Sequence, residues 1–286
     1  MNGAQNRDTE ILFGEYVLRL KPESGHSING STARSVHAFL LNVIGLSDPS
    51  AARRLHGWKG SKPFTVSRLI GKIEKEDSNL IISKDQVYTV RITCYEEAAN
   101  RAIIRTLSNF FGNKEPVELW GERFYIEEFL VASLRSYPPV LGGGDLEEKV
   151  NEFLDPENNH SVLIKFFSPT AFKKNDKLYL FPDSLSVFKS LYQKSAHYKN
   201  KLGLTEEFPE EAADAIVVDR YRLSTSVVKW GDIAIPGFKG EAVYDMKRLG
   251  KEERKLFFKL SFLANYTGVG IKTTQGMGQS VAQPVR

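Results

Sequence analysis

The 286-residue chain contains only one cysteine, Cys94. A single thiol excludes an internal disulfide framework and cannot by itself make a thiolate metal site. We therefore expect Cys94 to be a small buried apolar residue in the reducing cytoplasm. Long apolar runs are also missing: no window approaches the roughly 18 apolar residues that a membrane span needs, and no basic stretch precedes an apolar run near the N-terminus. The sequence predicts a cytoplasmic protein without a membrane partner.

Metal-binding patterns are absent as well. The chain has no HExxH, no Cys-x-x-Cys pair and no cluster of acids with histidine at ligand spacing. We expect neither a metal site nor a cofactor. Any hydrolytic chemistry would then be performed by side chains, and histidine is the side chain whose ordinary pKa suits proton transfer near neutral pH.

Acidic residues are missing from two long stretches. The net charge of +4 is modest, but a phosphate-binding surface depends on charge gathered on one face rather than on the total. Residues 49–73 and 254–286 contain no Asp or Glu. Either run alone is typical of a solvated surface; two runs, one rich in glycine and one with Trp58 and Phe64, favour a groove for a polyanion. The basic residues of the two runs include Arg53, Arg54, Lys59, Lys62, Arg68, Lys72, Lys255, Lys259 and Lys272.

The first half alternates strand and helix patterns. An apolar segment at 9–20 predicts a strand, and Ser31 or Thr32 can cap a helix that ends near Gly45. A short helix at 48–56 leads to a loop at 57–63. The remaining predicted elements are strands at 64–73 and 86–95, a helix at 96–110, and a strand pair or one long strand at 117–132. Their order is β-α-β-β-α-β.

The same order repeats in the second half. Pro-Pro, three consecutive glycines and a run of acids between 138 and 160 indicate a linker or a surface excursion. Beyond it we predict a strand at 162–167, a helix at 184–198, long strands at 216–230 and 233–247 joined at Gly231-Asp232, a helix at 251–266 and a last strand at 278–285. Two such units predict an α+β protein of two tandem ferredoxin-like (RRM-like) domains, whose cleft can accept single-stranded RNA. The predicted domains are residues 1–140 and 161–286, with a linker at 141–160.

A glycine-rich segment, called the Gly-rich loop below, spans residues 268–278. It follows a predicted helix and precedes a strand, whereas a dinucleotide-binding fingerprint follows a strand and opens a helix. Its backbone N–H groups could approach phosphates closely, and a helix C-cap at Gly268 followed by a bulged strand is the alternative. The candidate RNA-binding residues in the loop are Gly268, Gly270, Lys272, Gly276 and Gly278.

Among the five histidines, His56 is the strongest candidate for catalysis. It lies at a predicted helix end with four basic residues within six positions, although a lone histidine in such a place is more often a solvent-exposed loop residue. His37 shares a helix face with Leu41 and could lie at the edge of the core. The other three, His26, His160 and His197, are interpreted as surface residues.

Several segments together resemble one family, the CRISPR-associated endoribonucleases of the RAMP superfamily (the sixth numbered Cas family), which excise guide RNAs from a repeat-containing precursor. The resemblance runs in family order over nearly the whole chain, and the combination of the 56–69 segment with the Gly-rich loop is the most specific part. The matching stretches are RRLHG at 53–57, KPFTVSRL at 62–69, LWGERFY at 119–125, FSPT at 167–170, FPD at 181–183, IPGFKG at 235–240 and the loop at 268–278.

The resemblance implies a tandem ferredoxin-like fold and metal-independent cleavage of CRISPR repeat RNA that leaves a 2′,3′-cyclic phosphate and a 5′-hydroxyl. By motif position, His56 matches the family's general acid/base and Lys62 the lysine that stabilises developing negative charge. The position where some members carry a catalytic tyrosine is Leu41, so that role is either empty or taken by His37. Repeat RNA is the implied partner; other Cas effector-complex subunits, and a monomeric or homodimeric state, are left open.

Further RNA contacts are expected from basic residues outside the motifs. Arg53, Arg54, Lys59 and Arg68 extend the acid-free run. Candidates on the second predicted hairpin are Arg220, Arg222 and Lys229, for which ordinary strand-surface charge is an equal alternative.

Two other functions remain open. The unfilled tyrosine position is consistent with a guide-RNA-binding subunit of the same superfamily that does not cut. An RNA-recognition module unrelated to CRISPR is the third alternative, and it predicts little preference for repeat RNA over scrambled sequence.

Overall fold

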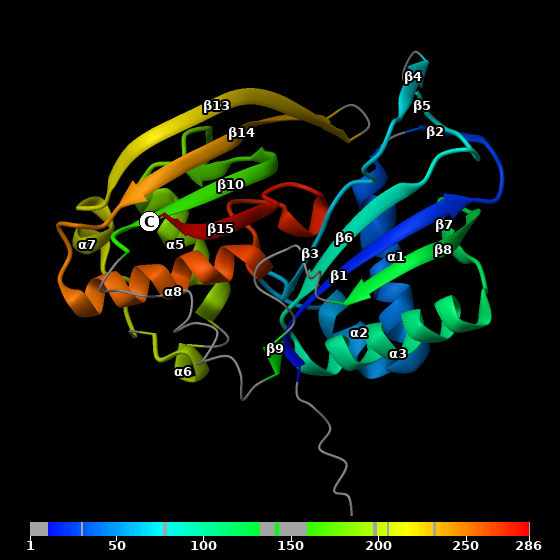
Figure 1. The fold of residues 1–286 in the computed structure, drawn as a ribbon, viewed down its shortest axis with the longest axis horizontal. Coiled ribbons are helices and arrows are strands. Elements are labelled where there is room, and N and C mark those ends of the chain that lie inside the picture. The colour runs from blue at the N-terminus through cyan, green and yellow to red at the C-terminus, as the bar shows by residue number, and fades with distance from the viewer. Residues whose placement is uncertain are drawn as a thin grey trace, which may run out of the picture.

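A computed structural model describes residues 11–29, 31–76, 79–131, 141–142, 159–196, 199–204, 206–230 and 233–285. The chain forms two α+β domains side by side, and the turn at residues 273–275, just before the last strand, lies where they meet (Figure 1). The predicted Gly231-Asp232 connection, His197 and most of the predicted 141–160 linker lie outside the described residues. Leu141 and Gly142, at the start of that linker, form β9 (Leu141–Gly142), which pairs with β1.

The first domain has the strand order of a ferredoxin-like fold. Its sheet runs β3-β6-β1-β8-β7, so the four strands of the βαββαβ unit lie in the order second, third, first, fourth, and every described pairing is antiparallel. The elements of this unit are β1 (Ile11–Pro22), α1 (Thr32–Ser47), β3 (Phe64–Val66), β6 (Tyr88–Cys94), α3 (Glu97–Asn113) and β8 (Glu122–Val131), with β7 (Val117–Leu119) at the edge.

The second domain repeats that permutation. Its sheet has the order β13-β14-β10-β15, again second, third, first, fourth. The tandem ferredoxin-like prediction is therefore confirmed. The unit consists of β10 (Ser161–Thr170), α5 (Ser184–Ser195), β13 (Val217–Trp230), β14 (Ile233–Asp245), α8 (Lys251–Thr267) and β15 (Ser280–Val285).

Several short elements decorate the two units. A three-stranded sheet of β2 (His26–Asn29), β5 (Asn79–Ile82) and β4 (Glu74–Glu76) projects from the first domain. A small hairpin joins β11 (Phe172–Lys174) to β12 (Lys177–Tyr179) through Asn175 and Asp176, both with positive φ. The other helices in the described residues are α2 (Pro49–His56), α6 (Lys199–Leu202), α7 (Glu210–Asp214) and the 3₁₀ turn η2 (Thr273–Gln275).

The predicted strand at 64–73 is wrong in its length, because β3 ends at Val66. Ser67 interrupts the ladder: its N–H still donates to the Arg91 carbonyl, but the Arg91 N–H turns to the Ser67 hydroxyl at 2.8 Å. Beyond this point only an isolated bridge between Ile70 and Thr89 continues the pairing. A serine hydroxyl competing for a backbone donor in this way shortens the strand.

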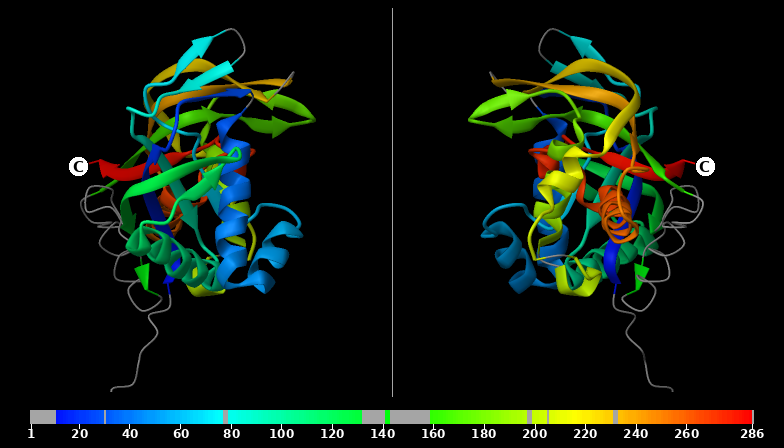
Figure 2. Two further views of the ribbon diagram at one scale, coloured as in Figure 1. Left: turned by 90° about the vertical axis from the view of Figure 1, so that its right-hand side faces the viewer. Right: turned by 90° about the vertical axis from the view of Figure 1, so that its left-hand side faces the viewer.

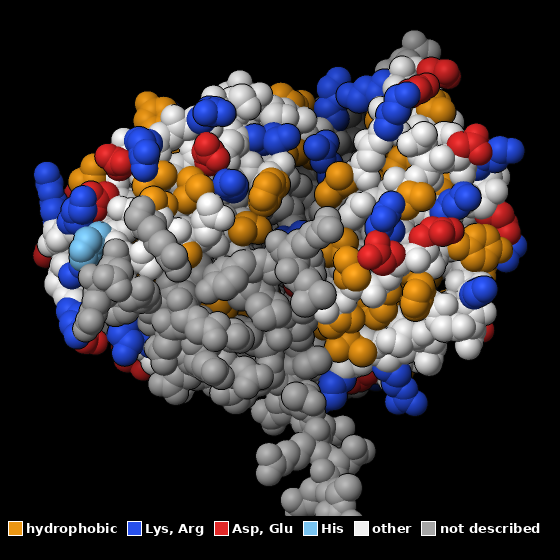
Figure 3. Space-filling model, in the orientation of Figure 1, with side chains coloured by type: hydrophobic (Ala, Val, Ile, Leu, Met, Phe, Trp, Pro, Cys, Tyr) orange, Lys and Arg blue, Asp and Glu red, His pale blue; other side chains and the backbone are white. Residues whose placement is uncertain are grey.

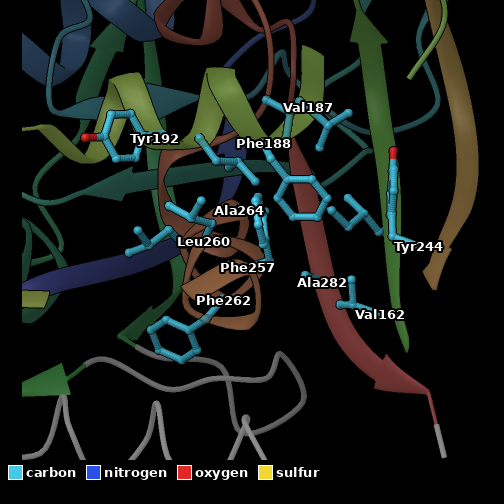
Figure 4. Packing of buried hydrophobic residues seen from close by; sticks show 14 of the residues in the cluster. Val162, Val187, Phe188, Tyr192, Tyr244, Phe257, Leu260, Phe262, Ala264 and Ala282 are labelled. Carbon is cyan, nitrogen blue, oxygen red and sulfur yellow. The ribbon is translucent and has the colours of Figure 1, made fainter. Parts of the chain in front are cut away.

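Each domain has its own hydrophobic core. In the first, α1 buries Val36, Phe39, Leu40, Val43 and Ile44, the helical spacing expected from the sequence, and it runs upright across the sheet with α2 at its lower end (Figure 2). In the second, Phe188 of α5 meets Phe257 of α8 at a ring distance of 5.1 Å, and both rings face the sheet (Figure 4). Cys94 is fully buried, as expected.

A polar network joins the domains. The guanidinium of Arg91 on β6 donates to Glu15 Oε1 at 2.6 Å, to Gln279 Oε1 at 2.7 Å and to the Asn265 carbonyl at 2.7 Å. Gln279 in turn donates from Nε2 to Thr65 Oγ1 at 2.8 Å. The C-terminal end of α8 and the Gly-rich loop are thereby held against the first sheet.

Candidate functional site

The site begins at the junction of α1, α2 and β3. Asp48 accepts from the Ala51 N–H at 2.9 Å and Pro49 occupies the first turn, so a new helix, α2, starts directly after α1. This helix ends at His56, with Gly57 as its C-cap residue. The short α2 therefore brings His56 and the loop that follows it next to α1. Its bounds agree with the short helix predicted at 48–56.

Lys62 closes the C-terminal end of α2. Its Nζ donates to the carbonyl oxygens of Leu55 and, at 2.7 Å, of His56. These carbonyls carry the negative end of the helix dipole, so an ammonium is favoured there. Burial lowers the pKa of Lys62 below its ordinary value.

His37 connects the two domains. Its Nδ1 lies 2.8 Å from the carbonyl oxygen of Thr274 in the Gly-rich loop, and its ring packs against Phe64 with a centroid distance of 5.2 Å. A carbonyl oxygen only accepts, so Nδ1 carries the proton and, in the neutral ring, Nε2 has the free lone pair. The contact fixes both the tautomer and the orientation of the imidazole.

The protonation state of His37 suits a base. Burial lowers its pKa, and the positive charges of Lys62 and His56 lower it further, while the hydrogen bond to Thr274 acts in the opposite direction. At neutral pH the ring is therefore mainly neutral. His56 is exposed at the end of α2, and its charge is near enough to act on His37.

The glycines of the Gly-rich loop are required by its own packing. Gly268, Gly270, Gly276 and Gly278 all have positive φ, and a Cβ at Gly278 would lie 2.0 Å from the Val269 carbonyl oxygen. Gly268 caps α8, as the alternative interpretation of this segment expected. The N–H groups of Gly270 and Gly278 donate to Ser190 Oγ at 2.9 Å and to the Pro169 carbonyl at 3.0 Å. These two amides are therefore used within the protein.

A groove of about 720 Å³ lies between the loop after α2, the β11 strand, α5 and the Gly-rich loop. Among the described residues, its lining contains six lysines and no Asp or Glu. Three of these also reach carboxylates outside the lining: Lys173 to Asp176, Lys174 to Asp183 and Lys189 to Glu210. A surface of this kind favours a polyanion over a cation or a neutral ligand. The six are Lys62, Lys173, Lys174, Lys189, Lys194 and Lys272.

The structure brings some of the predicted site residues together. Lys62, Gly270 and Lys272 line the groove, and His37 reaches the Gly-rich loop beside it. Arg68 packs against Gly276, whose added Cβ would lie 2.8 Å from Arg68 Cγ.

Other predicted residues lie outside the groove. Arg53 and Lys59 are exposed near α2, and Arg54 forms an ion pair with Glu96 at 2.5 Å. Lys and Arg side chains also gather around the upper end of the β13–β14 hairpin and the neighbouring β4–β5 arm (Figure 3). The hairpin residues Arg220, Arg222 and Lys229 are exposed on β13, and none of them lines the groove.

Sequence reasoning missed the lysines of the second domain that line the groove. Lys173 and Lys174 lie on a hairpin too short to show a strand pattern, and Lys189 and Lys194 lie on a helix that was predicted without assigning its lysines a role. The adjacent Lys173-Lys174 pair, which follows the FSPT stretch that carries the family resemblance, could have suggested them.

No group of three or more His, Cys, Asp or Glu side chains within the described part of the chain is arranged to hold a metal ion. Over the same residues, no helix is both long enough and apolar enough to cross a membrane.

The fold and the site define a class: tandem ferredoxin-like proteins with a basic groove and a histidine-lysine cluster at the domain junction. Two family models match the chain, "CRISPR Cas6 N-terminal domain" over residues 14–108 and "CRISPR-associated endoribonuclease Cas6" over residues 164–280. Together they cover about three quarters of its length. The chain belongs to the Cas6 family.

Individual relatives agree with this assignment. The chain is 29% identical over 134 residues to the CRISPR-associated endoribonuclease Cas6 of Streptococcus thermophilus; the match covers 46% of this chain and about half (54%) of that relative. A Cas6 product complex superposes with a TM-score of 0.74 at 22% identity, covering 96% of this chain and all of the other. A structure of Thermus thermophilus Cas6 gives 0.62 at 21% identity, covering 95% and 98%. At these identities the solved structures establish the shared fold.

Proposed function

We propose that the protein is a metal-independent endoribonuclease that cuts CRISPR repeat RNA in a precursor transcript. The proposal rests on the family assignment and is carried by one observation above the others, the neutral His37 whose Nδ1 is bound to Thr274 and whose Nε2 is available as a base. Relatives named as CRISPR-associated endoribonucleases and a neighbour described as a product complex support the same substrate class.

The proposed reaction needs two proton transfers and one site of charge stabilisation. Nε2 of His37 takes the proton from the 2′-hydroxyl, whose oxygen attacks the adjacent phosphorus. The phosphorane carries extra negative charge, which the Lys62 ammonium stabilises after leaving the carbonyls of α2. His56, in its protonated form, then donates to the departing 5′-oxygen as the P–O5′ bond breaks. The products are a 2′,3′-cyclic phosphate and a 5′-hydroxyl.

His37 thereby fills the role of the tyrosine that is absent at Leu41. Leu41 lies one turn further along α1 and is half-buried against the first core, so its side chain offers no group for proton transfer. His37 lies on the same helix and has what a base requires: a fixed tautomer and a lowered pKa.

The RNA backbone is proposed to follow the lysine-lined groove. It would contact the Gly-rich loop through Lys272 rather than through the amides of Gly270 and Gly278, because these amides already donate within the protein. The exposed basic residues Arg53 and Lys59 continue the same surface toward α2.

The test is a cleavage assay on the host's repeat RNA, with and without EDTA, followed by mapping of the product ends. We expect a cyclic phosphate, no effect of EDTA, and loss of cleavage in both His37→Ala and His56→Ala while repeat binding is nearly retained. His160→Ala is the matched control, because His160 contacts Arg254 outside the groove. If chelation stopped the reaction, the mechanism would be wrong; if no product formed at any pH from mildly acidic to mildly basic, the protein would be an RNA-binding subunit instead.

A further inference from the structure

Lys194 is a lysine buried at the wall of the groove. Its side chain belongs to the last turn of α5, and the residue is only 6% exposed. Nζ lies 3.4 Å from the Thr267 carbonyl, 3.3 Å from the Gly268 carbonyl and 3.4 Å from Thr273 Oγ1. An ammonium has three donors, and here three neutral acceptors surround it.

Burial of this ammonium costs free energy, and no carboxylate in the described part of the chain offsets that cost. Among the described residues Lys194 makes no ion pair, and burial lowers the pKa of its ammonium to about 7. Two of its acceptors are carbonyls at the C-terminal end of α8, where the helix dipole partly compensates the charge. A methionine could fill the same space, but it would leave these three acceptors without the donors of Lys194.

One of the Lys194 donors contacts Thr273, at the centre of the Gly-rich loop. A Cβ at Gly278 would lie 2.8 Å, and one at Gly268 3.1 Å, from the methyl carbon of Thr273. The two glycines therefore leave the space that the Thr273 methyl fills, while Lys194 holds the hydroxyl on the other side. A second contact from α5, Ser190 Oγ to the Gly270 N–H, fixes the start of the loop.

The next residue along the loop, Thr274, presents its carbonyl to His37. We propose that Lys194 is a positioning residue: by holding Thr273, it sets the Thr274 carbonyl that keeps the proton of His37 on Nδ1 and leaves Nε2 as the base. The inference rests on the proposed role of His37 in cleavage, but the tautomer it describes exists without RNA. The two ideas can therefore fail separately.

The variants are Lys194→Met, which keeps the length of the side chain and removes the donors, and Thr273→Val, which keeps the methyl packing and removes the hydroxyl. The first measurement is the ¹⁵N NMR spectrum of the histidine rings without RNA. We expect His37 to be the Nδ1–H tautomer in the wild-type protein and to lose this preference in both variants. Lys199→Met is the matched control, since Lys199 donates to the Glu206 carbonyl outside the groove, and it should leave the tautomer unchanged.

The second measurement is single-turnover cleavage at saturating protein, together with the affinity for a repeat whose scissile nucleotide lacks the 2′-hydroxyl. Loss of the partner that orients a metal-bound histidine costs roughly 10- to 100-fold in affinity or activity. By analogy we expect a decrease of about that size in the cleavage rate, with little change in affinity. The double variant should be no slower than the slower single one, because both substitutions break the same contact.

Three results would overturn the inference. One is an unchanged His37 tautomer in Lys194→Met and Thr273→Val. Another is weaker RNA binding with a smaller salt dependence and an unchanged rate, which would make Lys194 a phosphate ligand. The third is a Thr273→Val protein, folded by circular dichroism, that cleaves at the wild-type rate. If no variant or wild-type protein cleaves RNA but the tautomer shifts as expected, the positioning role stands and the proposed function falls.

Discussion

Replacing Arg91 by methionine should destabilise the protein more than any comparable change of a surface arginine. Its guanidinium is held by three acceptors within 2.7 Å, of which Glu15 belongs to the first domain and Gln279 and the Asn265 carbonyl to the second. The ion-paired side chains of Arg91 and Glu15 are only 17% and 5% exposed. The variant therefore removes the guanidinium that pairs with the nearly enclosed Glu15 carboxylate, while methionine replaces the hydrocarbon part of the Arg91 side chain.

The size of the effect follows from this burial. Removing one partner of a buried ion pair costs roughly 3–5 kcal/mol, whereas an exposed pair contributes about 0–1 kcal/mol. Arg19→Met is the matched control: Arg19 lies on the adjacent strand β1 and pairs with Glu128 at 3.4 Å, with side chains 53% and 42% exposed. Adding Glu15→Leu to Arg91→Met should recover part of the loss, because the enclosed charge is then removed as well.

The assay is urea unfolding followed by circular dichroism and tryptophan fluorescence at pH 7. In the wild-type protein both probes should report one transition, and in Arg91→Met the transition should move to lower urea and separate by domain, since the broken contacts join the two domains. If Arg91→Met lost no more free energy of unfolding than Arg19→Met, the network would not hold the domains together and the reasoning would be refuted.

Three further predictions concern the groove and the Gly-rich loop. Relative to Lys194→Met, the wild-type protein should gain free energy of unfolding as the pH rises from about 7, the pKa of Lys194 in the folded protein, to its ordinary value of 10.5. In this window Lys194 is protonated in the unfolded chain but not in the folded one, so the slope is positive and at most about 1.4 kcal/mol per pH unit. Urea titrations at several pH values measure this slope. Gly278→Ala should lower the melting temperature and the cleavage rate because its Cβ would lie 2.0 Å from the Val269 carbonyl oxygen, whereas Gly112→Ala, with nothing within 4 Å, should change stability by no more than about 1 kcal/mol. Lys272→Ala should weaken repeat binding and reduce the slope of log affinity against log salt by about one; unchanged affinity and slope would exclude a phosphate contact there.

Much of the fold could be predicted because its determinants are local. The period of the apolar residues identified α1, α3, α5 and α8, and the repeated βαββαβ order led to the ferredoxin-like topology that the sheets adopt. The β4–β5 arm and the β11–β12 hairpin were missed, since strands of three or four residues carry too few positions to show an alternation. The end of β3 depends on a hydrogen bond that the Arg91 N–H donates to the Ser67 hydroxyl oxygen, and a pattern of apolar residues cannot predict such a bond.

The candidate site, like the fold, could be predicted where its contacts are local in the sequence and not where they are distant. His56 and Lys62 lie six positions apart on one local segment, so motif spacing could pair them, and the structure joins them through the bond from Lys62 to the carbonyl of His56. The bond between His37 and Thr274 spans 237 positions and exists only because two domains dock. The burial of Lys194 also depends on the Gly-rich loop, which is distant in the sequence. From the sequence alone, a lysine on an amphipathic helix is therefore interpreted as an ordinary surface charge.

The Gly-rich loop contributes to this site in a different way from that suggested by its composition. Glycines beside a lysine and two threonines suggested amides turned toward phosphate, but the amides of Gly270 and Gly278 donate to Ser190 and Pro169. What the loop offers the first domain is an acceptor, the Thr274 carbonyl on His37. The positive φ angles of Gly268, Gly270, Gly276 and Gly278 belong to the close packing of the loop that presents this carbonyl. Substitutions in the loop should therefore slow cleavage even where they leave every RNA contact in place.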